Sequence, residues 1–507
     1  MSERSSEGVT GSGDANLSRR SLLELAGLAV ATAAIPAGLM VPELSASTAS
    51  FSGDAASPVM GTLSKYMSEA GDKAVPDEVA EKAKQHVLDA FAAMISGSEL
   101  PPGRAALGFA EAYGGKGVST VVASKMLCGP MEAAMVNGVL AHSDETDDSN
   151  GPSHSHPGVA VVPAALAVGE RFGISGDRFL RAVTLGYDVG CRFTIALGGQ
   201  RYENESHFST HSIATIFGAA AAAGCAASLN VEQIKMLIGY AAQQCSGLTA
   251  WRRDSEHIQK AFVFGGMTAR SGVTSALVVH AGWTGVEDIL SGTDNFFEAF
   301  NPKADPGVLV DKLGERYEIS RTDIKKWTVG SPIQAVLDSM TILLERHHYN
   351  AEQVKQVNVH LAPPEALTVN NREIPDICVQ HMTAVMLLDK TVTFKSAHEQ
   401  ARMKDPAILR ERAKVQLVPD EALSRFLPTR VAKVEIILMD GTQLSEEVDA
   451  VRGTAKNPMS HDEVIAKARD LVTPVLGEAK CSELIEKITK IGNVKNVVEI
   501  RPALQLR

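Results

Sequence analysis

Residues 215–230 read TIFGAAAAAGCAASLN, and this stretch decides the fold of the chain around it. Alanine is the strongest helix former, so the run from Ala219 to Ala223 predicts a helix. Its side chains are small and uncharged, and the distance between packed helices is set by the side chains at their contact. The stretch therefore predicts a buried helix that its neighbours approach closely, as part of a helical domain.

The helical pattern extends on both sides of this run, from about residue 75 to residue 300. In residues 81–96, apolar side chains at Ala83, Val87, Phe91 and Ile95 recur at the spacing of an amphipathic helix. Segments 156–173 and 230–247 end in Gly and segment 215–230 ends in Asn, which is typical of helix ends. Further helices are predicted over residues 156–173, 175–193 and 230–247.

The pattern changes after about residue 315. Residues 354–362, 413–419 and 431–451 alternate apolar and polar side chains, which predicts strands, and Asp440-Gly441 predicts a hairpin turn. Residues 376–390 and 405–414, which lie between the strands, have a helical pattern. The predicted fold is mainly α: an all-helical domain over residues 59–315, completed by C-terminal helices within residues 460–507, and a smaller α+β lid domain over residues 316–459.

Composition and charge narrow the class of protein. The chain has 507 residues, of which 45% are hydrophobic, and this is enough for a large buried core. Its net charge of −11 argues against a nucleic-acid binder, because phosphate binding requires a surplus of basic side chains. The six cysteines are widely scattered with no CxxC pair, so we expect free thiols.

The first fifty residues have the layout of an export signal. Arg19 and Arg20 precede an apolar stretch from Leu22 to Val41, and small residues follow up to Ala49. This arrangement is typical of a twin-arginine signal, with cleavage after Ala46 or Ala49, and it predicts a periplasmic protein with no membrane association after signal removal. The alternatives are a membrane anchor or a disordered tail. A stable membrane span is less favoured, because Pro36 interrupts a stretch rich in Ala and Gly.

Acidic side chains and imidazoles are concentrated in residues 141–158, AHSDETDDSNGPSHSHPG. Three interpretations compete: a metal site, a metal-free acid/base site, or a solvated polar loop. The metal site would use His142, His154 and His156, with Asp144 and Asp147 available to complete it. Only the residue types match that hypothesis, because the spacing fits no established zinc motif.

We favour metal-free proton chemistry, in which a base removes a proton next to a carboxylate and cations hold the resulting anion. The loop supplies carboxylates and imidazoles but no cation. The nearest cations lie in residues 251–272, WRRDSEHIQKAFVFGGMTARSG, and include Lys260 and Arg270. The alternative for these side chains is a solvated helix face.

Four segments resemble the MmgE/PrpD family, which includes 2-methylcitrate dehydratase, cis-aconitate decarboxylase and iminodisuccinate epimerase. They occur in the family's order: NGVLAHSDETDDS (137–149), HPGVAVVPAALAVGE (156–170), GYDVGCRF (186–193) and GTAKNPMSHDEV (453–464). The resemblance runs from about residue 75 to the end of the chain. It implies an all-helical domain with an α+β lid, a cleft between them, a homodimer, and no cofactor or metal.

The resemblance also implies site residues. The acid before the family's Asp-Asp pair corresponds to Glu145, with Asp144 beside it, and the family's His-Pro histidine corresponds to His156. Lys260 corresponds to the family's lysine. Two histidines and one tyrosine of the family are replaced in this chain. Ser209 stands in the place of the first histidine, with His207 and His211 two residues to either side, and Val263 and Phe264 stand in the place of the second. Trp327 replaces the tyrosine.

The sequence thus predicts a cofactor-independent lyase or isomerase acting on a small di- or tricarboxylate. Dehydration like that of 2-methylcitrate dehydratase is favoured, with decarboxylation or epimerisation as alternatives. The expected catalytic residues are Glu145, Asp144, His156 and Lys260, and the expected substrate-binding residues are Ser149, Asp147, His211 and Arg270. The other hypotheses are a non-catalytic periplasmic carboxylate-binding protein, and a metal-dependent hydrolase using His142, His154 and His156.

Overall fold

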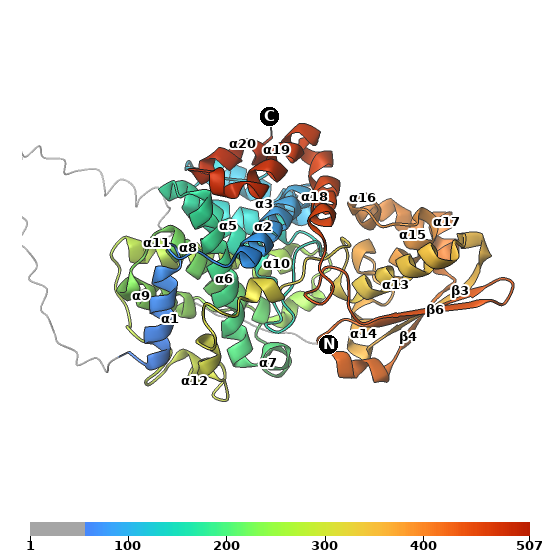
Figure 1. The fold of residues 1–507 in the computed structure, drawn as a ribbon, viewed down its shortest axis with the longest axis horizontal. Coiled ribbons are helices and arrows are strands. Elements are labelled where there is room, and N and C mark those ends of the chain that lie inside the picture. The colour runs from blue at the N-terminus through green and yellow to red at the C-terminus, as the bar shows by residue number, and fades with distance from the viewer. Residues whose placement is uncertain (1–55, 507) are drawn as a thin grey trace, which may run out of the picture. The chain divides into compact units, whose positions relative to one another are not determined.

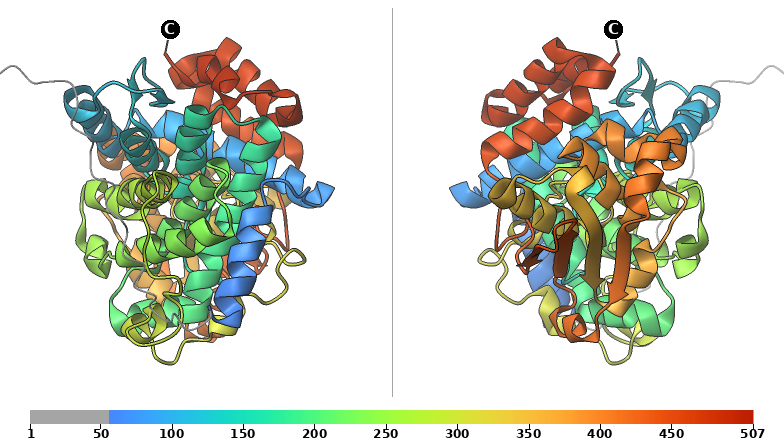
Figure 2. Two further views of the ribbon diagram at one scale, coloured as in Figure 1. Left: turned by 90° about the vertical axis from the view of Figure 1, so that its left-hand side faces the viewer. Right: turned by 90° about the vertical axis from the view of Figure 1, so that its right-hand side faces the viewer.

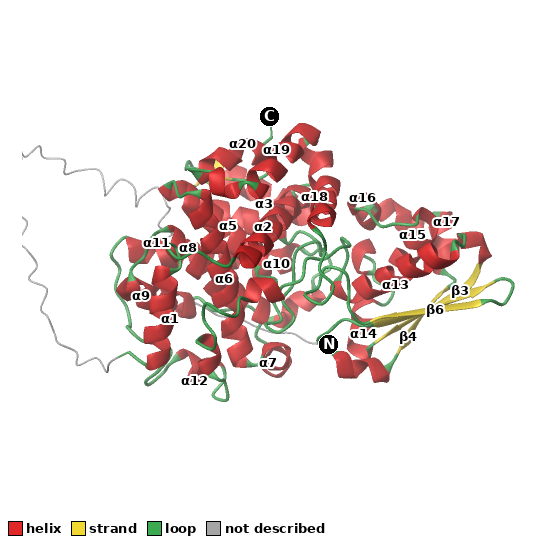
Figure 3. Cartoon of the chain, in the orientation of Figure 1, coloured by secondary structure: helices red, strands yellow, loops and turns green. Residues whose placement is uncertain are grey.

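The computed structural model describes residues 56–506. The predicted export signal over residues 1–50 lies outside this range and stays a prediction. The prediction of a mainly α chain with a smaller α+β domain is confirmed, and Figure 3 shows helices throughout with the long strands gathered in one domain.

Two large hydrophobic cores divide the described chain. The first core is built from residues between Met60 and Ile324 together with residues between Met459 and Leu504, and the second from residues between Trp327 and Val451. Figure 1 shows the C-terminal helices, in red, beside α2 of the first core. The α+β domain is therefore an insertion into the helical one.

Among the described residues, the helical domain is formed by fifteen α-helices and a short β-ribbon. Their bounds are α1 Pro58–Glu69, α2 Asp77–Gly97, α3 Pro101–Tyr113, β1 Ser119–Thr120, β2 Leu127–Cys128, α4 Pro130–Ala141, α5 Gly158–Phe172, α6 Gly176–Leu197, α7 Gly199–Ser206, α8 Thr210–Ala226, α9 Val231–Gln243, α10 Ile258–Ala261, α11 Met267–His280, α12 Phe296–Phe300, α18 His461–Leu476, α19 Glu478–Thr489 and α20 Arg501–Leu504, with strand pairing β1–β2.

Helix α8 contains the alanine run and packs against α5, α6, α9 and α11, and all of its residues are buried. The helices pack this closely because the residues of α8 at the contacts are mostly Gly and Ala, whose side chains are small. A Cβ added at Gly218 would lie 2.8 Å from the backbone oxygen of Gly186 on α6, so α6 and α8 are in backbone contact. Larger side chains at these positions would push the helices apart.

A close approach of the same kind positions the loop after α4. A Cβ added at Gly138 would lie 2.3 Å from the backbone oxygen of Gly265. Gly265 belongs to a π-helical turn, Phe262–Gly266, between α10 and α11. The C-terminal end of α4, and hence His142, is thereby held beside this turn. The run Ile258–His280 is apolar enough by length and composition to cross a membrane, but here it packs against α4, α8 and α9.

The α+β domain contains one four-stranded sheet of order β4-β3-β5-β6. Strands β3 and β4 are parallel, whereas β3–β5 and β5–β6 are antiparallel, and the predicted turn at Asp440-Gly441 joins β5 to β6. Figure 2 (right) looks onto this sheet, against which α13 and α15 pack. The bounds are α13 Ser331–His347, β3 Val354–Leu361, α14 Pro363–Val369, α15 Val379–Asp389, α16 Phe394–His398, α17 Pro406–Arg412, β4 Val415–Pro419, β5 Ala432–Leu438 and β6 Gln443–Val448.

Candidate active site

The acidic loop between α4 and α5 is buried. Asp144, Glu145, Asp147 and Asp148 are only 4%, 7%, 2% and 3% exposed. A carboxylate removed from water needs a hydrogen-bonding or charged partner, so each of these groups must be held by another part of the chain. This burial excludes the interpretation of the segment as a solvated polar loop.

Asp148 fixes the loop to the helical domain. Tyr187 of α6 donates to its Oδ2 at 2.5 Å, and His86 Nδ1 of α2 lies 2.9 Å from the same oxygen. The backbone N–H of Gly158, the first residue of α5, donates to Oδ1 at 3.1 Å. All of these contacts are internal, so Asp148 is a positioning residue that connects three helices through one carboxylate.

His156 and Asp147 form a hydrogen-bonded pair at the edge of a cavity. His156 Nδ1 lies 2.8 Å from Asp147 Oδ2 and 2.7 Å from the backbone oxygen of Asp148. Because both partners are acceptors, Nδ1 carries the proton and Nε2 is left free. Burial alone would raise the pKa of Asp147, but His142 and His156, with Lys325, hold that pKa well below its usual value. Asp147 is therefore an ionised group that orients the His156 ring.

Glu145 lies beyond this pair and contacts two lysines. Its carboxylate pairs with the ammonium group of Lys260 on α10, and Lys325 Nζ donates to its backbone oxygen at 2.9 Å. Burial would raise the pKa of Glu145, but Lys260 and Lys325 hold it well below the usual value. Burial and Lys260 together lower the pKa of His257, which lies 3.9 Å from the same carboxylate, to about 3. Glu145 is thus ionised and His257 is neutral at neutral pH.

Aromatic rings connect these groups. The ring of Phe264, from the π-helical turn, stacks on His142 at 4.5 Å and on His211 at 4.1 Å between centroids. The His156 ring lies 5.2 Å from both histidine rings. Burial holds the pKa of His211 well below its usual value. Burial also lowers the pKa of His142. The three imidazoles and Phe264 therefore form one cluster of packed rings.

The cavity beside His156 has a volume of about 420 Å³ and lies between the acidic loop and the α+β domain. Three cationic side chains line it: Arg321, Arg430 and Lys456. The imidazoles of His154, His156 and His211 line the same space, as does Asp323, whose pKa is raised to about 6 by burial. A cavity lined by several cations and by imidazoles is suited to a ligand that carries more than one carboxylate.

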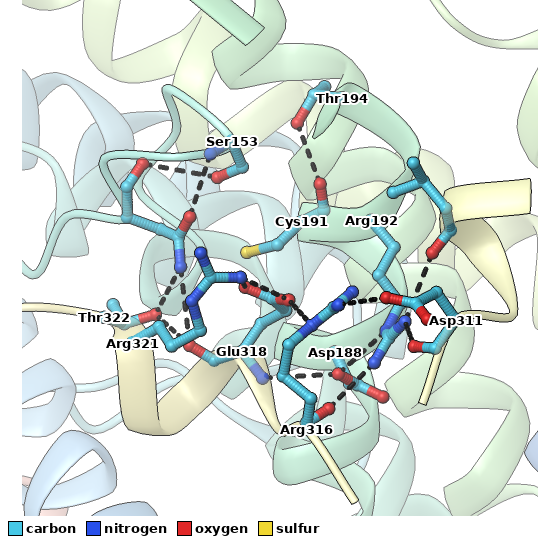
Figure 4. Close-up of polar contacts among 12 residues, drawn as sticks. Ser153, Asp188, Cys191, Arg192, Thr194, Asp311, Arg316, Glu318, Arg321 and Thr322 are labelled. Carbon is cyan, nitrogen blue, oxygen red and sulfur yellow. Dashed lines mark hydrogen bonds and ion pairs between the residues drawn. The ribbon is translucent and has the colours of Figure 1, made fainter. Parts of the chain in front are cut away.

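An ionic network reaches the cavity through Arg321, and Figure 4 shows its side chains. Arg192 and Asp188 of α6 are fully buried and paired at 3.0 Å. The backbone N–H of Glu318 donates to Asp188, and the Glu318 carboxylate accepts from Arg321 NH1 at 3.0 Å. Asn150 Nδ2 of the loop donates to Thr322 Oγ1 at 3.0 Å. The network thus fixes one cavity arginine and one end of the acidic loop to the same helix.

Asp144 joins the loop to the α+β domain. Thr146 donates to it through its N–H and its hydroxyl, at 2.9 and 2.5 Å, and His398 Nε2 of α16 lies 2.9 Å from Oδ2. Although burial opposes it, the hydrogen bond to Asp144 and the charges of Asp144 and Asp376 raise the pKa of His398 to about 9. His398 is therefore a cation that connects the two domains.

Removing this cation should change how stability depends on pH. The His398 pKa is about 9 when folded and 6.5 when unfolded, so its contribution is complete below pH 6.5 and is lost as the pH rises through 9. We expect roughly 3 kcal/mol of unfolding free energy to be lost across this window. In His398→Gln most of that pH dependence should disappear, as measured by urea unfolding at several pH values.

The exposed His347 provides the matched control, because His347→Gln should keep the wild-type pH dependence. The groups facing His398 are Asp144 and Asp376, with Glu145 and Lys260 nearby. Burial raises the pKa of Asp376 to about 7, so this group also favours the folded state at low pH. An unchanged pH dependence in His398→Gln would contradict the assignment.

The structure brings most of the predicted site residues together. His156, Asp147, Glu145, Lys260 and His211 belong to the cluster, and Ser149 lines the cavity. Asp144 lies at the domain contact. Arg270 is the exception: it is exposed on α11 and lines no part of the cavity, because it lies on the solvent side of a helix whose other face is buried.

The hypothesis of a metal site formed by His142, His154 and His156 does not match the arrangement of donor atoms. His142 and His156 group with Asp147, whereas His154 groups with Glu203 and His211. The three imidazoles therefore do not share one ligand set among the described residues.

The sequence did not predict several members of the site: His257 before α10, Lys325 in the loop before α13, Glu203 on α7 and His398 on α16. Each is a single polar residue in a separate segment with no motif of its own. Trp327 donates its Nε1 proton to Asp338 at 2.9 Å and supports α13, so it lies outside the cavity lining.

Comparisons with known proteins agree with this architecture. A model of the MmgE/PrpD N-terminal domain matches residues 61–309, and a model of the MmgE/PrpD C-terminal domain matches residues 327–491. The chain is 23% identical to a cis-aconitate decarboxylase of Aspergillus terreus over 485 residues, which cover 89% of this chain and 96% of the relative. It is 24% identical to the cis-aconitate decarboxylase of Homo sapiens over 448 residues, which cover 84% of this chain and 88% of that relative. It is 23% identical to the cis-aconitate decarboxylase of Mus musculus over 441 residues, which cover 83% of this chain and 88% of that relative.

Proposed function

Because the chain belongs to the MmgE/PrpD family, we propose that it is a cofactor-independent lyase acting on a small di- or tricarboxylate by proton transfer next to a carboxylate. The observation that carries the proposal is the His156–Asp147 pair at a cavity with three cationic side chains. An imidazole with Nδ1 fixed by a carboxylate and Nε2 free has the arrangement required of a general acid or base.

Decarboxylation is the proposed branch, since the relatives reported above are named cis-aconitate decarboxylases. Dehydration, favoured by sequence reasoning, has no specific support from them. In the decarboxylation, one C–C bond to a carboxylate breaks, CO₂ leaves, and its electron pair shifts through the neighbouring double bond. His156 Nε2, once it has taken up a proton from water, donates that proton to the carbon that receives the electrons, and the imidazole returns to its neutral form with the proton on Nδ1.

The cations have the complementary task of holding the carboxylates. We assign this role to Arg321, Arg430 and Lys456 at the cavity wall, and to Lys260, which pairs with Glu145. Lys260 would exchange its ion pair with Glu145 for one with the substrate, which leaves Glu145 as a second proton acceptor. Asp144 is less suited to that task, since both of its oxygens already accept hydrogen bonds or an ion pair.

Proton exchange in D₂O tests the function. The purified protein would be incubated with cis-aconitate, citrate and related di- and tricarboxylates, and followed by NMR together with CO₂ release. Deuterium incorporation with CO₂ release supports decarboxylation, and incorporation with loss of water supports dehydration. A carboxylate that raises the melting temperature without any exchange would favour the alternative of a non-catalytic binding protein.

Lys456→Met tests the carboxylate-binding role of the cavity wall. Lys456 is exposed at the cavity wall, so its loss should leave the fold unchanged. We expect KM to rise about tenfold with kcat within about twofold, because a charged hydrogen bond to the substrate is lost. The measurement is steady-state kinetics on the substrate found by exchange. Lys355→Met, at an exposed position on β3 away from the cavity, is the control, and an unchanged KM in Lys456→Met would remove Lys456 from the site.

A further inference from the structure

A second group of side chains at the cavity wall has the composition of a metal site. His154, Glu203 and His211 place three donor atoms within 4.8 Å of one another. His154 Nε2 lies 3.4 Å from Glu203 Oε1, and His211 Nε2 lies 3.9 Å from Glu203 Oε2. Two ligands bound to zinc in tetrahedral geometry are separated by about 3.4 Å, so the donor atoms, which lie within 4.8 Å of one another, would have to move closer by up to about 1.4 Å to bind one ion.

The three ligands are held by their own segments. Glu203 on α7 is fully buried, and Thr210 donates to its Oε2 through both N–H and hydroxyl, at 3.0 and 2.9 Å. The Thr210 hydroxyl also lies 2.8 Å from the backbone oxygen of His154. His154 has φ +51, a left-handed conformation that is uncommon for a histidine and that turns its ring toward Glu203. A carboxylate oriented by neighbouring donors is typical of metal ligands.

The two other groups of this kind are less suited to an ion. In the group of His142, Asp147 and His156, the Nδ1 atom of His156 must keep its proton, since it lies 2.7 Å from the backbone oxygen of Asp148. In the group of His142, Glu145 and His257, the carboxylate is paired with the Lys260 ammonium. In contrast, the Nε2 atoms of His154 and His211 face only Glu203 among the described acidic residues.

The charges around Glu203 and the position of the two histidines at the cavity also favour His154, Glu203 and His211 as metal ligands. The cation nearest to Glu203 is Arg252, whose NH2 lies 2.6 Å from Oε1, but the Arg252 side chain is 46% exposed, so solvent screens its charge. His154 and His211 line the cavity, so further coordination positions of an ion between them would be open to water or to a carboxylate oxygen of a bound ligand.

We propose that His154, Glu203 and His211 form a binding site for a divalent transition metal of the zinc class, with an open coordination position at the cavity. A donor set of two imidazoles and one carboxylate is typical of such ions. The site goes beyond the proposed lyase activity, which uses His156 and Asp147. Its occupancy can be measured with no substrate present, so either proposal can fail without the other.

The test is metal binding to the chelator-treated full chain. Cobalt(II) would be followed by its visible d–d absorption and zinc(II) by calorimetry. We expect one equivalent per chain, with tetrahedral or five-coordinate cobalt bands. His154→Asn keeps a residue that tolerates the left-handed conformation, and Glu203→Gln keeps the side-chain shape. Each should weaken binding by at least about 100-fold.

His257→Asn is the matched control, since His257 is a buried imidazole of the same cluster outside the proposed ligand set. It should bind the metal as the wild type does. Absence of stoichiometric binding, or undiminished binding in a folded His154→Asn variant, would overturn the proposal. Loss of binding in His257→Asn would do so as well, because it would place the ion elsewhere in the cluster.

Discussion

Replacing His156 by alanine should lower turnover by about 10² to 10⁴-fold, the usual contribution of a general acid or base. The reason is geometric: Nδ1 is held by Asp147 and by the backbone oxygen of Asp148, and Nε2 is the group available to a ligand in the cavity. The measurement is the initial rate of product formation with the substrate identified by exchange in D₂O. His347→Ala, at an exposed position on α13, should keep full activity.

Asp147→Asn provides a second test, because Asp147 acts through His156. The single variant should lose part of the turnover, and the double variant with His156→Ala should be no slower than His156→Ala alone. Two residues that act as one unit give such non-additive losses. Additive losses would show that Asp147 has a task of its own, and full activity of His156→Ala would remove the imidazole from the mechanism.

Arg192→Met should lower the free energy of unfolding by about 3–5 kcal/mol, the usual cost of removing one partner of a buried ion pair. Arg192 and Asp188 are both 0% exposed, and burial raises the pKa of Asp188 even with Arg192 beside it. The same guanidinium donates to backbone oxygens of Val308, Asp311 and Arg316. Its loss would leave a buried carboxylate and three carbonyls without their donor.

Urea unfolding or thermal unfolding measures this effect, and Arg201→Met is its control. Arg201 pairs with Glu205 at the same i,i+4 spacing, but the two side chains are 81% and 65% exposed. An exposed pair contributes about 0–1 kcal/mol, so the control should change stability little. Equal effects in the two variants would contradict the importance assigned to burial.

The sequence predicted most of the fold because its signals were local. The alanine run at 219–223 predicted α8, and Asp440-Gly441 predicted the hairpin between β5 and β6. The change from helical to alternating sequence pattern near residue 315 lies close to the border between the two hydrophobic cores. In each case a segment of ten to twenty residues contains the information, since helical and strand periodicities are short-range patterns.

The site was predicted only in part, because its members interact over long stretches of chain. The acidic loop was recognisable from its composition, and His156 and Lys260 from the family resemblance. Nothing local marks Lys325 or His398 as partners of Glu145 and Asp144, since each comes from a distant segment. Arg270 was placed in the site on the strength of its charge and its neighbours, but helix geometry puts it on the solvent side of α11.

Lys467 of α18 has a consequence for how the molecule is assembled. Its buried ammonium pairs with Asp89 of α2 and donates to the backbone oxygen of Thr146, a contact across 321 positions of sequence. The loop that holds His156 therefore takes its final shape only after a segment far downstream has docked. Contacts of such sequence separation form late in folding, since closing a long loop costs entropy first. During folding, the helices would thus form well before the loop that holds His156 reaches its final position in the active site.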